Sequence, residues 1–80
     1  MDERLISILI FIDQQQRQYG SPPSIREICE HFYYASTSVG NHWLDQVEKS
    51  GLIERIHGRA RGIRITDFGR KEIDHAVATN

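Results

Sequence analysis

The sequence predicts a small α+β fold, mostly α, in which three helices precede a β-hairpin and an additional helix follows it. Two observations support this prediction. Apolar residues recur at helical spacing in three segments before Gly51, and beyond it β-prone residues flank a short loop that contains a glycine. Because a chain of 80 residues can build one hydrophobic core but not two, we expect residues 1–80 to form a single domain.

The first helix is expected over about residues 3–19. Its apolar residues are spaced as on one face of an amphipathic helix, and they are Leu5, Ile8, Leu9 and Ile12. Gly20 can end the helix, because glycine readily adopts the left-handed conformation found at helix C-caps. The prolines at 22–23 then favour an extended connection to the next element.

Two further helices are expected over about residues 25–32 and 37–50. Ser24 and Glu27 have the spacing of a capping box, in which each side chain accepts a hydrogen bond from the other residue's backbone N–H group. Ser36 is the next candidate N-cap, and the periodic segment behind it runs until the glycine at position 51 stops it.

A β-hairpin is expected over residues 52–66, with strands at about 52–57 and 61–66. Leucine and isoleucine recur in both strands, and the intervening segment HGRAR is short enough for a hairpin loop. The pair Thr66-Asp67 can then cap a last helix over about residues 67–78.

Two short helices joined by a three- or four-residue turn form a helix-turn-helix unit. A β-hairpin directly after the second of these helices adds a wing to the unit. The predicted architecture is therefore a winged helix-turn-helix, in which the third helix is held at a fixed angle so that it can be used for recognition.

The last helix has two candidate roles that the sequence does not separate. Phe68, Ile73 and Val77 could form the contact of a homodimer, or the helix could close the core over the first helix. Both roles would use the apolar side chains that recur along this segment.

The composition is that of an ordinary globular domain. Hydrophobic residues make up 39% of the chain and charged residues 26%, which does not match a disordered segment. The longest apolar run, Ile8–Ile12, is too short to cross a bilayer, and the acidic start MDER is unlike a secretory signal. One cysteine rules out an internal disulfide and fits a reducing compartment, so we expect a cytoplasmic location and no membrane partner.

The distribution of charge favours a nucleic-acid partner more than the net charge of −1 does. From Gly51 onward there are six basic and four acidic residues, whereas the preceding segment has four basic and seven acidic residues. The stretch ERIHGRARGIRI contains four arginines and a single acid. Because a phosphate responds to charges within about 8–10 Å at moderate salt, a local basic stripe matters more than the sum.

Three segments resemble the N-terminal DNA-binding domain of the LexA repressor family: GSPPSIREIC, STSVGNHWLDQVEKSGLIE and GRARGIRI. The resemblance covers about residues 3–65. It implies a winged helix that reads operator DNA through its third helix. By position, it assigns contact with bases to Ser36, Ser38, Val39, Asn41 and His42. It assigns the approach to phosphates to the wing residues Arg59, Ala60 and Arg61.

The sequence departs from the family pattern at several positions. Tyr33 occupies the place of a turn glycine, where a positive φ would strain a tyrosine. Gly40 replaces a small apolar residue within the third helix, and a helical glycine costs roughly 1 kcal/mol relative to alanine. LexA proteins also carry a C-terminal self-cleaving peptidase, which residues 1–80 do not include, so we do not carry over self-cleavage or a damage response.

Helix geometry gives an independent indication of the face that the third helix exposes. At about 100° per residue, the buried stripe consists of Gly40, Leu44 and Val47. The opposite face and its flanks carry Ser38, Asn41, His42, Asp45, Gln46 and Lys49. The amides of Asn41 and Gln46 can each bond adenine in a bidentate way, and His42 can donate to guanine. The alternative is that this polar face is only solvated.

Basic residues on and near the wing are candidates for contact with the DNA backbone. Arg59 and Arg61 are two residues apart, so in a regular strand their side chains would point the same way, and Arg64 follows them. The alternative is that these charges protect the edges of the hairpin from aggregation. Further expected backbone contacts lie at the start of the second helix, whose N-terminus attracts phosphate, and at the end of the third: Ser24, Arg26 and Lys49.

We therefore expect a sequence-specific double-stranded DNA-binding transcriptional regulator, a repressor rather than an enzyme. No histidine or cysteine pair has zinc-motif spacing, and no phosphate-binding glycine loop is evident, so no metal, cofactor or small-molecule ligand is expected. The alternative is a winged helix that binds protein and not DNA, which the net acidity, Gly40 and Asp45 favour. A further alternative is that residues 1–80 are part of a larger regulator.

Overall fold

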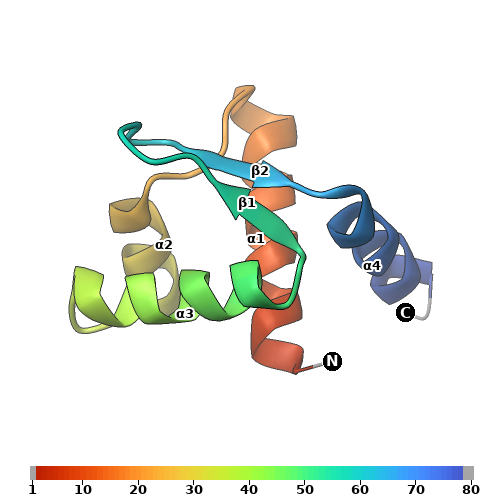
Figure 1. Ribbon diagram of the computed structural model, residues 1–80, viewed down its shortest axis with the longest axis horizontal. Coiled ribbons are helices and arrows are strands. Elements are labelled where there is room, and N and C mark those ends of the chain that lie inside the picture. The colour runs from red at the N-terminus through yellow and green to blue at the C-terminus, as the bar shows by residue number, and fades with distance from the viewer. Residues whose placement is uncertain (1, 79–80) are drawn as a thin grey trace.

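The computed structural model describes residues 2–78, in which four helices surround one β-hairpin (Figure 1). In chain order the elements are α1 (Glu3–Tyr19), α2 (Ile25–Phe32), α3 (Thr37–Lys49), β1 (Ile53–Arg55), β2 (Ile63–Ile65) and α4 (Asp67–Ala78). α1 stands between α2 and α4, and the hairpin crosses in front of it in Figure 1. This arrangement confirms the predicted winged helix-turn-helix with an additional C-terminal helix. No helix within the described range is long and apolar enough to cross a membrane.

The hydrophobic core lies where α1, α3, the hairpin and α4 meet. The four α1 residues expected to share one face are all buried: Leu5, Ile8, Leu9 and Ile12. Other elements contribute buried side chains as well: Ile28, Leu44, Val47, Leu52, Ile53 and Ile73. Because full burial of one such side chain stabilises a protein by about 1.5–3 kcal/mol, this cluster fixes the positions of the elements around it.

Local hydrogen bonds define the ends of α2 and α3. The predicted capping box is present: Ser24 N–H donates to Glu27 Oε1 at 2.9 Å, and Glu27 N–H donates to Ser24 Oγ at 3.2 Å. At the start of α3, Ser36 Oγ accepts a hydrogen bond from Val39 N–H at 3.4 Å. α3 ends one residue before the predicted end because Ser50 takes the C-cap position.

The contact between α2 and α3 explains the glycine within α3. A Cβ atom on Gly40 would overlap Cys29 Sγ and would lie 2.9 Å from Ile25 Cδ1. The absent side chain therefore lets α3 approach α2 more closely than a larger residue would allow. The close packing of the two helices offsets the lower helix propensity of glycine.

The wing is a two-stranded antiparallel hairpin that is shorter than predicted. Its pairs are Ile53 with Ile65, Glu54 with Arg64, and Arg55 with Ile63. The predicted strands at 52–57 and 61–66 are too long, because turns occupy the loop between the paired residues. Gly58 has φ 82°, and a Cβ on Gly62 would overlap the Ile56 carbonyl oxygen. The loop is thus folded tightly on itself and leaves no room for longer strands.

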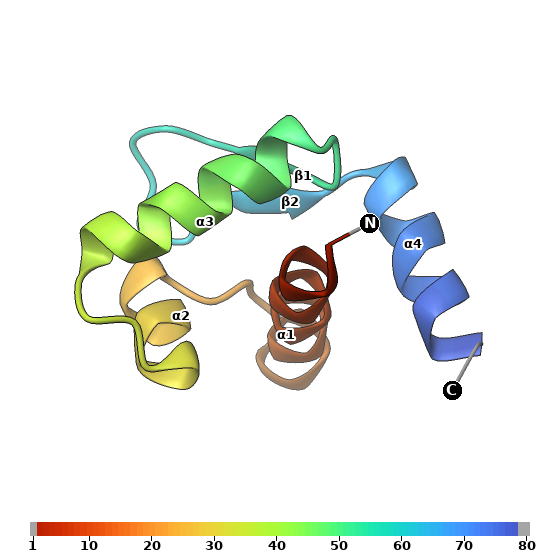
Figure 2. The same ribbon diagram turned by 90° about the horizontal axis from the view of Figure 1, so that it is seen from below.

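α4 packs against α1 on the side away from α2 (Figure 2). Ile73 is 3% exposed and belongs to the core, so it closes the core of this chain and is not available as the predicted dimer contact. Phe68 and Val77 are 44% and 61% exposed, and they remain accessible on the surface of the helix.

Candidate nucleic-acid interface

α3 buries one face and exposes a polar face at its amino-terminal end. Its buried residues are Gly40, Leu44 and Val47, which confirms the stripe indicated by helical spacing. Four of the six residues predicted to read bases lie exposed along α3 and its N-cap: Ser36, Ser38, Val39 and His42. The other two, Asn41 and Gln46, are half-buried and lie on opposite flanks of the helix.

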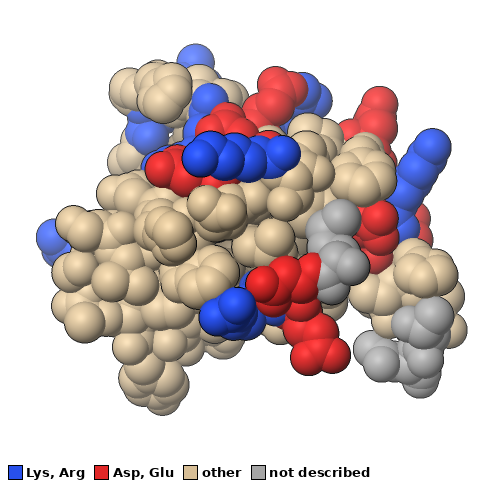
Figure 3. All heavy atoms as spheres, turned by 60° about the horizontal axis from the view of Figure 1, so that its bottom comes forward, with Lys and Arg blue, Asp and Glu red and all other residues tan. Residues whose placement is uncertain are grey.

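The exposed face of α3 is nearly uncharged over its amino-terminal half. Figure 3 shows few charged side chains at its left, where α2 and the start of α3 lie, and interspersed acids and bases above and in the centre. Within α3 the charged residues are Asp45, Glu48 and Lys49, all in the carboxyl-terminal half. Contacts to a ligand at the start of α3 must therefore be hydrogen bonds and van der Waals contacts, and attraction to phosphate must come from other elements.

Arg55 of β1 joins the wing to the flank of α3. Its Nη2 donates to Asn41 Oδ1 at 2.9 Å, and its Nη1 donates to Asp45 Oδ1 at 2.8 Å in an ion pair. Its backbone N–H donates to Glu48 Oε2 at 2.9 Å. The Arg55 side chain is 23% exposed, so the guanidinium is held between the hairpin and the helix.

Sequence reasoning did not assign a role to Arg55, although a signal for it was present. Asn41, Asp45 and Glu48 are spaced at i, i+4 and i+7, so they line one side of α3 with oxygen acceptors. A row of acceptors predicts that a donor side chain from a neighbouring element binds there. Arg55 is the arginine closest in sequence to the end of α3. Asp45 is therefore partly neutralised by Arg55.

The arginines of the wing make different contacts, and the regular strand in which Arg59 and Arg61 would point the same way does not extend to them. Both residues lie in the loop between β1 and β2, where the alternation of a strand does not apply. Arg61 Nη1 donates to the Pro22 carbonyl at 3.0 Å and forms an ion pair with Glu27. Arg64 pairs with Glu54 on the neighbouring strand.

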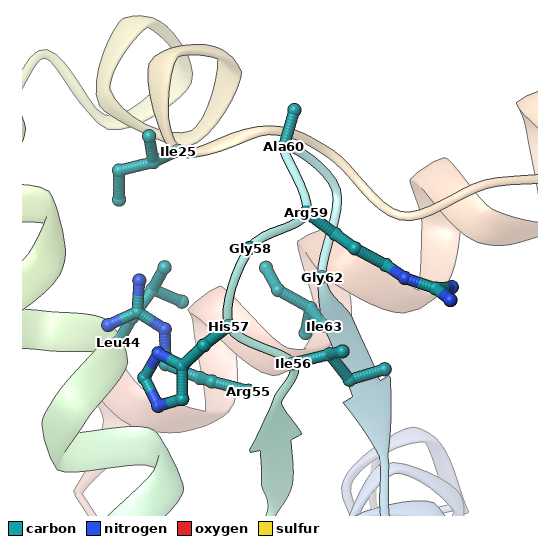
Figure 4. A pocket seen from close by; sticks show the side chains of 10 residues that line it. All are labelled: Ile25, Leu44, Arg55, Ile56, His57, Gly58, Arg59, Ala60, Gly62 and Ile63. Carbon is teal, nitrogen blue, oxygen red and sulfur yellow. The ribbon is translucent and has the colours of Figure 1, made fainter.

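Arg59 and Ala60 lie exposed at the end of the loop. Figure 4 shows the Arg59 side chain extending away from α3 and from the other labelled side chains. Of the three wing arginines predicted to meet phosphate, Arg59 is the one without an ion pair to another residue of the described range. It can therefore turn toward a ligand without breaking an internal contact.

The amino-terminal end of α2 lies directly beside the wing loop. Hydrogen bonds from Arg61 and from the backbone of Ser24 hold the pKa of Glu27 below its ordinary value. Glu27 is thus an ionised partner for Arg61 at neutral pH. Ser24 is engaged in the capping box, and Arg26 is exposed one residue into the helix.

A cleft of about 220 Å³ separates the wing loop from α2 and α3 (Figure 4). Ile25 and Leu44 contribute apolar walls, while His57 and Arg55 reach across from the hairpin toward α3. The loop, the start of α2 and the start of α3 lie on one side of the molecule, away from α4, in both Figure 1 and Figure 2. The three segments that contain the predicted contact residues therefore lie in the same half of the molecule.

Comparison with known proteins identifies the family to which this chain belongs. The model of the LexA DNA binding domain matches residues 2–62, which include α1, α2, α3, β1 and the wing loop. This chain belongs to the LexA DNA-binding domain family. The membership confirms the resemblance that the segments GSPPSIREIC, STSVGNHWLDQVEKSGLIE and GRARGIRI indicate.

Similar full proteins are longer than this chain. It is 42% identical over 64 residues to the LexA repressor of Clostridium botulinum strain Hall, and 34% identical over 65 residues to that of Acetivibrio thermocellus. It is 35% identical over 72 residues to the LexA repressor of Oenococcus oeni. These alignments cover 79%, 81% and 90% of the chain but 32%, 30% and 34% of the respective relatives. The chain thus corresponds to about a third of each relative's length.

Proposed function

We propose that this LexA-family domain is the DNA-binding part of a sequence-specific transcriptional repressor, with α3 in the major groove and the wing on the adjacent backbone. The observation that carries the proposal is the exposed, uncharged face of α3, which presents side chains from Ser36 to His42 while the opposite stripe is buried. The family membership and the relatives named LexA repressor support the same function. The role is binding and not catalysis.

Each exposed residue of α3 has a chemical role suited to a base edge. Ser38 can donate or accept a hydrogen bond, and His42 can donate to guanine. Val39 can contact the methyl group of thymine, and Ser36 lies beside it at the N-cap. Gln46 lies nearer the carboxyl-terminal end of the helix and would reach a base at the margin of the site.

Contacts to the DNA backbone come from the elements around α3. The helix dipole and the position of Ser24 and Arg26 favour a phosphate at the start of α2. Arg59 at the end of the wing loop would meet a phosphate on the neighbouring strand. The remaining proposed backbone contacts are Lys49, Ala60, Arg61 and Arg64.

Two copies of the domain are needed for tight binding. A single recognition module buries only about 600–1,000 Å² of its surface on DNA, which limits its affinity. A homodimer on a paired half-site would double the contact area. The exposed side chains of Phe68 and Val77 on α4 are candidates for such a contact.

The test is selection of bound duplexes from a randomised pool at about 150 mM salt, where non-specific attraction to phosphate is weakened. An enriched motif, in particular a palindrome with half-sites about 10 base pairs apart, is the expected result. Binding without enrichment, and only at low ionic strength, would overturn the proposal.

A protein-binding winged helix is the second candidate function. It is favoured by the internal pairing of basic residues, since Arg55, Arg61 and Arg64 each bind an acid of the same chain. Such pairing lowers the positive potential available to DNA. The randomised selection separates the two functions, because this second candidate predicts no enriched duplex.

A further inference from the structure

Arg55 of the wing contacts the side chain of Asn41 on the flank of α3. The Asn41 carboxamide lies on the flank of α3 beside the exposed reading face, and its oxygen accepts the 2.9 Å hydrogen bond from Arg55 Nη2. The same guanidinium forms an ion pair with Asp45, and the backbone N–H of Arg55 donates to the Glu48 carboxylate. Arg55 therefore has little freedom to release Asn41.

The chemistry of the two groups determines the orientation of the amide. A guanidinium has N–H donors and no acceptor, so the atom of Asn41 that faces it must be the carbonyl oxygen. The Asn41 Nδ2 group then points away from Arg55. An amide rotated by 180° would place N–H donors against N–H donors, which is unfavourable.

This orientation changes what Asn41 can recognise. Bidentate recognition of adenine requires an amide oxygen that accepts from N6 and an amide nitrogen that donates to N7. Because Arg55 engages the oxygen and fixes its direction, the two N–H donors of Nδ2 are the groups that stay fully free for a base edge. In the major groove guanine presents two neighbouring acceptors, N7 and O6, and thymine presents O4, whereas the one acceptor of adenine, N7, stands beside an amino donor.

We propose that Arg55 is a positioning residue that determines specificity, and that by holding the Asn41 oxygen it makes Asn41 a donor that favours guanine or thymine over adenine. This inference rests on the proposed function, because it assumes that α3 reads bases. It replaces the expectation, drawn from the residue type alone, that Asn41 bonds adenine in a bidentate way. The specificity of α3 is then set partly by a residue of the wing.

The experiment compares duplex selections for the unaltered chain and for the Asn41→Ala and Arg55→Met variants. Asn41→Ala identifies the base position that Asn41 reads, because the preference at that position alone should flatten. Arg55→Met keeps an unbranched side chain but removes the donors, so the Asn41 amide is free to rotate. At the identified position we expect guanine or thymine to lose at least about fivefold in preference and adenine to gain, the size expected for one base contact.

Asp45→Asn is the matched control. It removes one acidic partner of the same guanidinium but leaves the bond between Arg55 and Asn41 in place. Preference at the Asn41 position should therefore stay as in the unaltered chain. Since preference is a ratio between bases, a general loss of affinity in Arg55→Met does not affect the comparison.

The outcomes separate the inference from the proposed function. An unaltered chain that enriches no motif would overturn the proposed function itself. A motif that Arg55→Met leaves unchanged at the Asn41 position, or an unaltered chain that selects adenine there, would overturn the role of Arg55 and leave the function standing.

A second measurement does not depend on DNA. The side-chain amide of Asn41 should give a distinct pair of NMR signals that move toward those of a solvent-exposed asparagine in Arg55→Met, while Asp45→Asn leaves them in place. Amide signals that are the same in all three proteins would overturn the proposed contact, and thermal unfolding of each variant verifies that it is folded.

Discussion

Tyr33 is held in a backbone conformation that an L-residue with a bulky side chain rarely adopts. Its φ of 58° and ψ of 37° lie in the left-handed region, and it is the one non-glycine residue of the described range with a positive φ. The side chain is 93% exposed, so packing of the ring does not offset the strain. The turn between α2 and α3 therefore needs this conformation for its geometry, and a glycine at this position would adopt it at lower cost.

We predict that Tyr33→Gly stabilises the domain. Removing the left-handed penalty of about 1–2 kcal/mol outweighs the greater flexibility of glycine in the unfolded chain, so the free energy of unfolding should rise by about 0.5–1 kcal/mol. For a domain of this size, thermal unfolding should show a rise in Tm of about 2–8 °C. Tyr33→Ala is the control, because it removes the ring and keeps the Cβ atom. An equal gain from Tyr33→Ala would contradict backbone strain as the cause.

The packing of elements accounts for a second unusual residue. Gly40 lets α3 lie against α2, and this contact fixes the angle between the two helices. A glycine that costs stability within one helix thus improves the contact between two helices. Replacing Gly40 by alanine would be favourable for helix propensity but unfavourable for packing. The sign of the net change in stability depends on the space between α2 and α3.

We predict that Gly40→Ala destabilises the domain by about 1–3 kcal/mol, because the new methyl group overlaps Cys29 Sγ. In a Cys29→Ala background the overlap is removed, so Gly40→Ala should cost less there. Urea unfolding of the four proteins measures this coupling as a double-mutant cycle. Additive costs would show that the sulfur atom is not what excludes a side chain at position 40.

The wing and α2 are coupled through the ion pair between Arg61 and Glu27. We predict that Glu27→Gln strengthens binding of any duplex, because glutamine can keep the capping box while Arg61 loses its competing carboxylate. The pKa of Glu27 is lowered, so the pairing is fully present at neutral pH and is lost only as the pH falls below the ordinary range of a glutamate.

The measurement is duplex affinity over a series of salt concentrations. Arg59→Ala breaks no ion pair. It should reduce the slope of log affinity against log salt concentration by an amount equivalent to about one phosphate contact. Arg61→Ala should have a smaller effect than Arg59→Ala while Glu27 is present, and a comparable effect in the Glu27→Gln background. An unchanged affinity for Glu27→Gln would show that the ion pair does not compete with phosphate.

The elements differ in how far they could be predicted. The capping box of Ser24 and Glu27 and the buried stripe of α3 depend on residues within one helical turn or face, so the sequence reveals them. The length of the strands depends on how Gly62 meets Ile56, and β-prone composition does not encode that contact. The role of Arg55 depends on a side chain that reaches α3 from another element, which periodicity does not show.

At the scale of the whole molecule, α4 is joined to α1 by an acid that is almost fully buried. The Asp13 side chain is 8% exposed, and its Oδ1 lies 2.9 Å from Arg70 Nη1 of α4 in an ionic contact without hydrogen-bond geometry. Its Oδ2 accepts from Arg17 Nε at 3.0 Å within α1. α4 lies wholly beyond the residues that the family model matches, so this contact attaches an additional helix to the shared winged-helix core.

We predict unequal costs for the two arginine partners of Asp13. Arg70→Met leaves a buried carboxylate with one partner and weakens the attachment of α4, so it should lower the free energy of unfolding by about 1–3 kcal/mol. Arg17→Met removes a side chain that is 68% exposed, and it should cost less than about 1 kcal/mol. Urea unfolding measures both values.

The double variant Asp13→Asn with Arg70→Met tests whether the unpaired charge is the cause of the larger cost. Asp13→Asn removes the buried negative charge that would otherwise lack a partner, so the double variant should be more stable than Arg70→Met alone. If it were less stable, the ion pair of Asp13 with Arg17 would matter more than the unpaired charge that Arg70→Met leaves. Either result shows whether that unpaired charge is what weakens the attachment of the C-terminal helix, with its exposed Phe68 and Val77, when Arg70 is replaced.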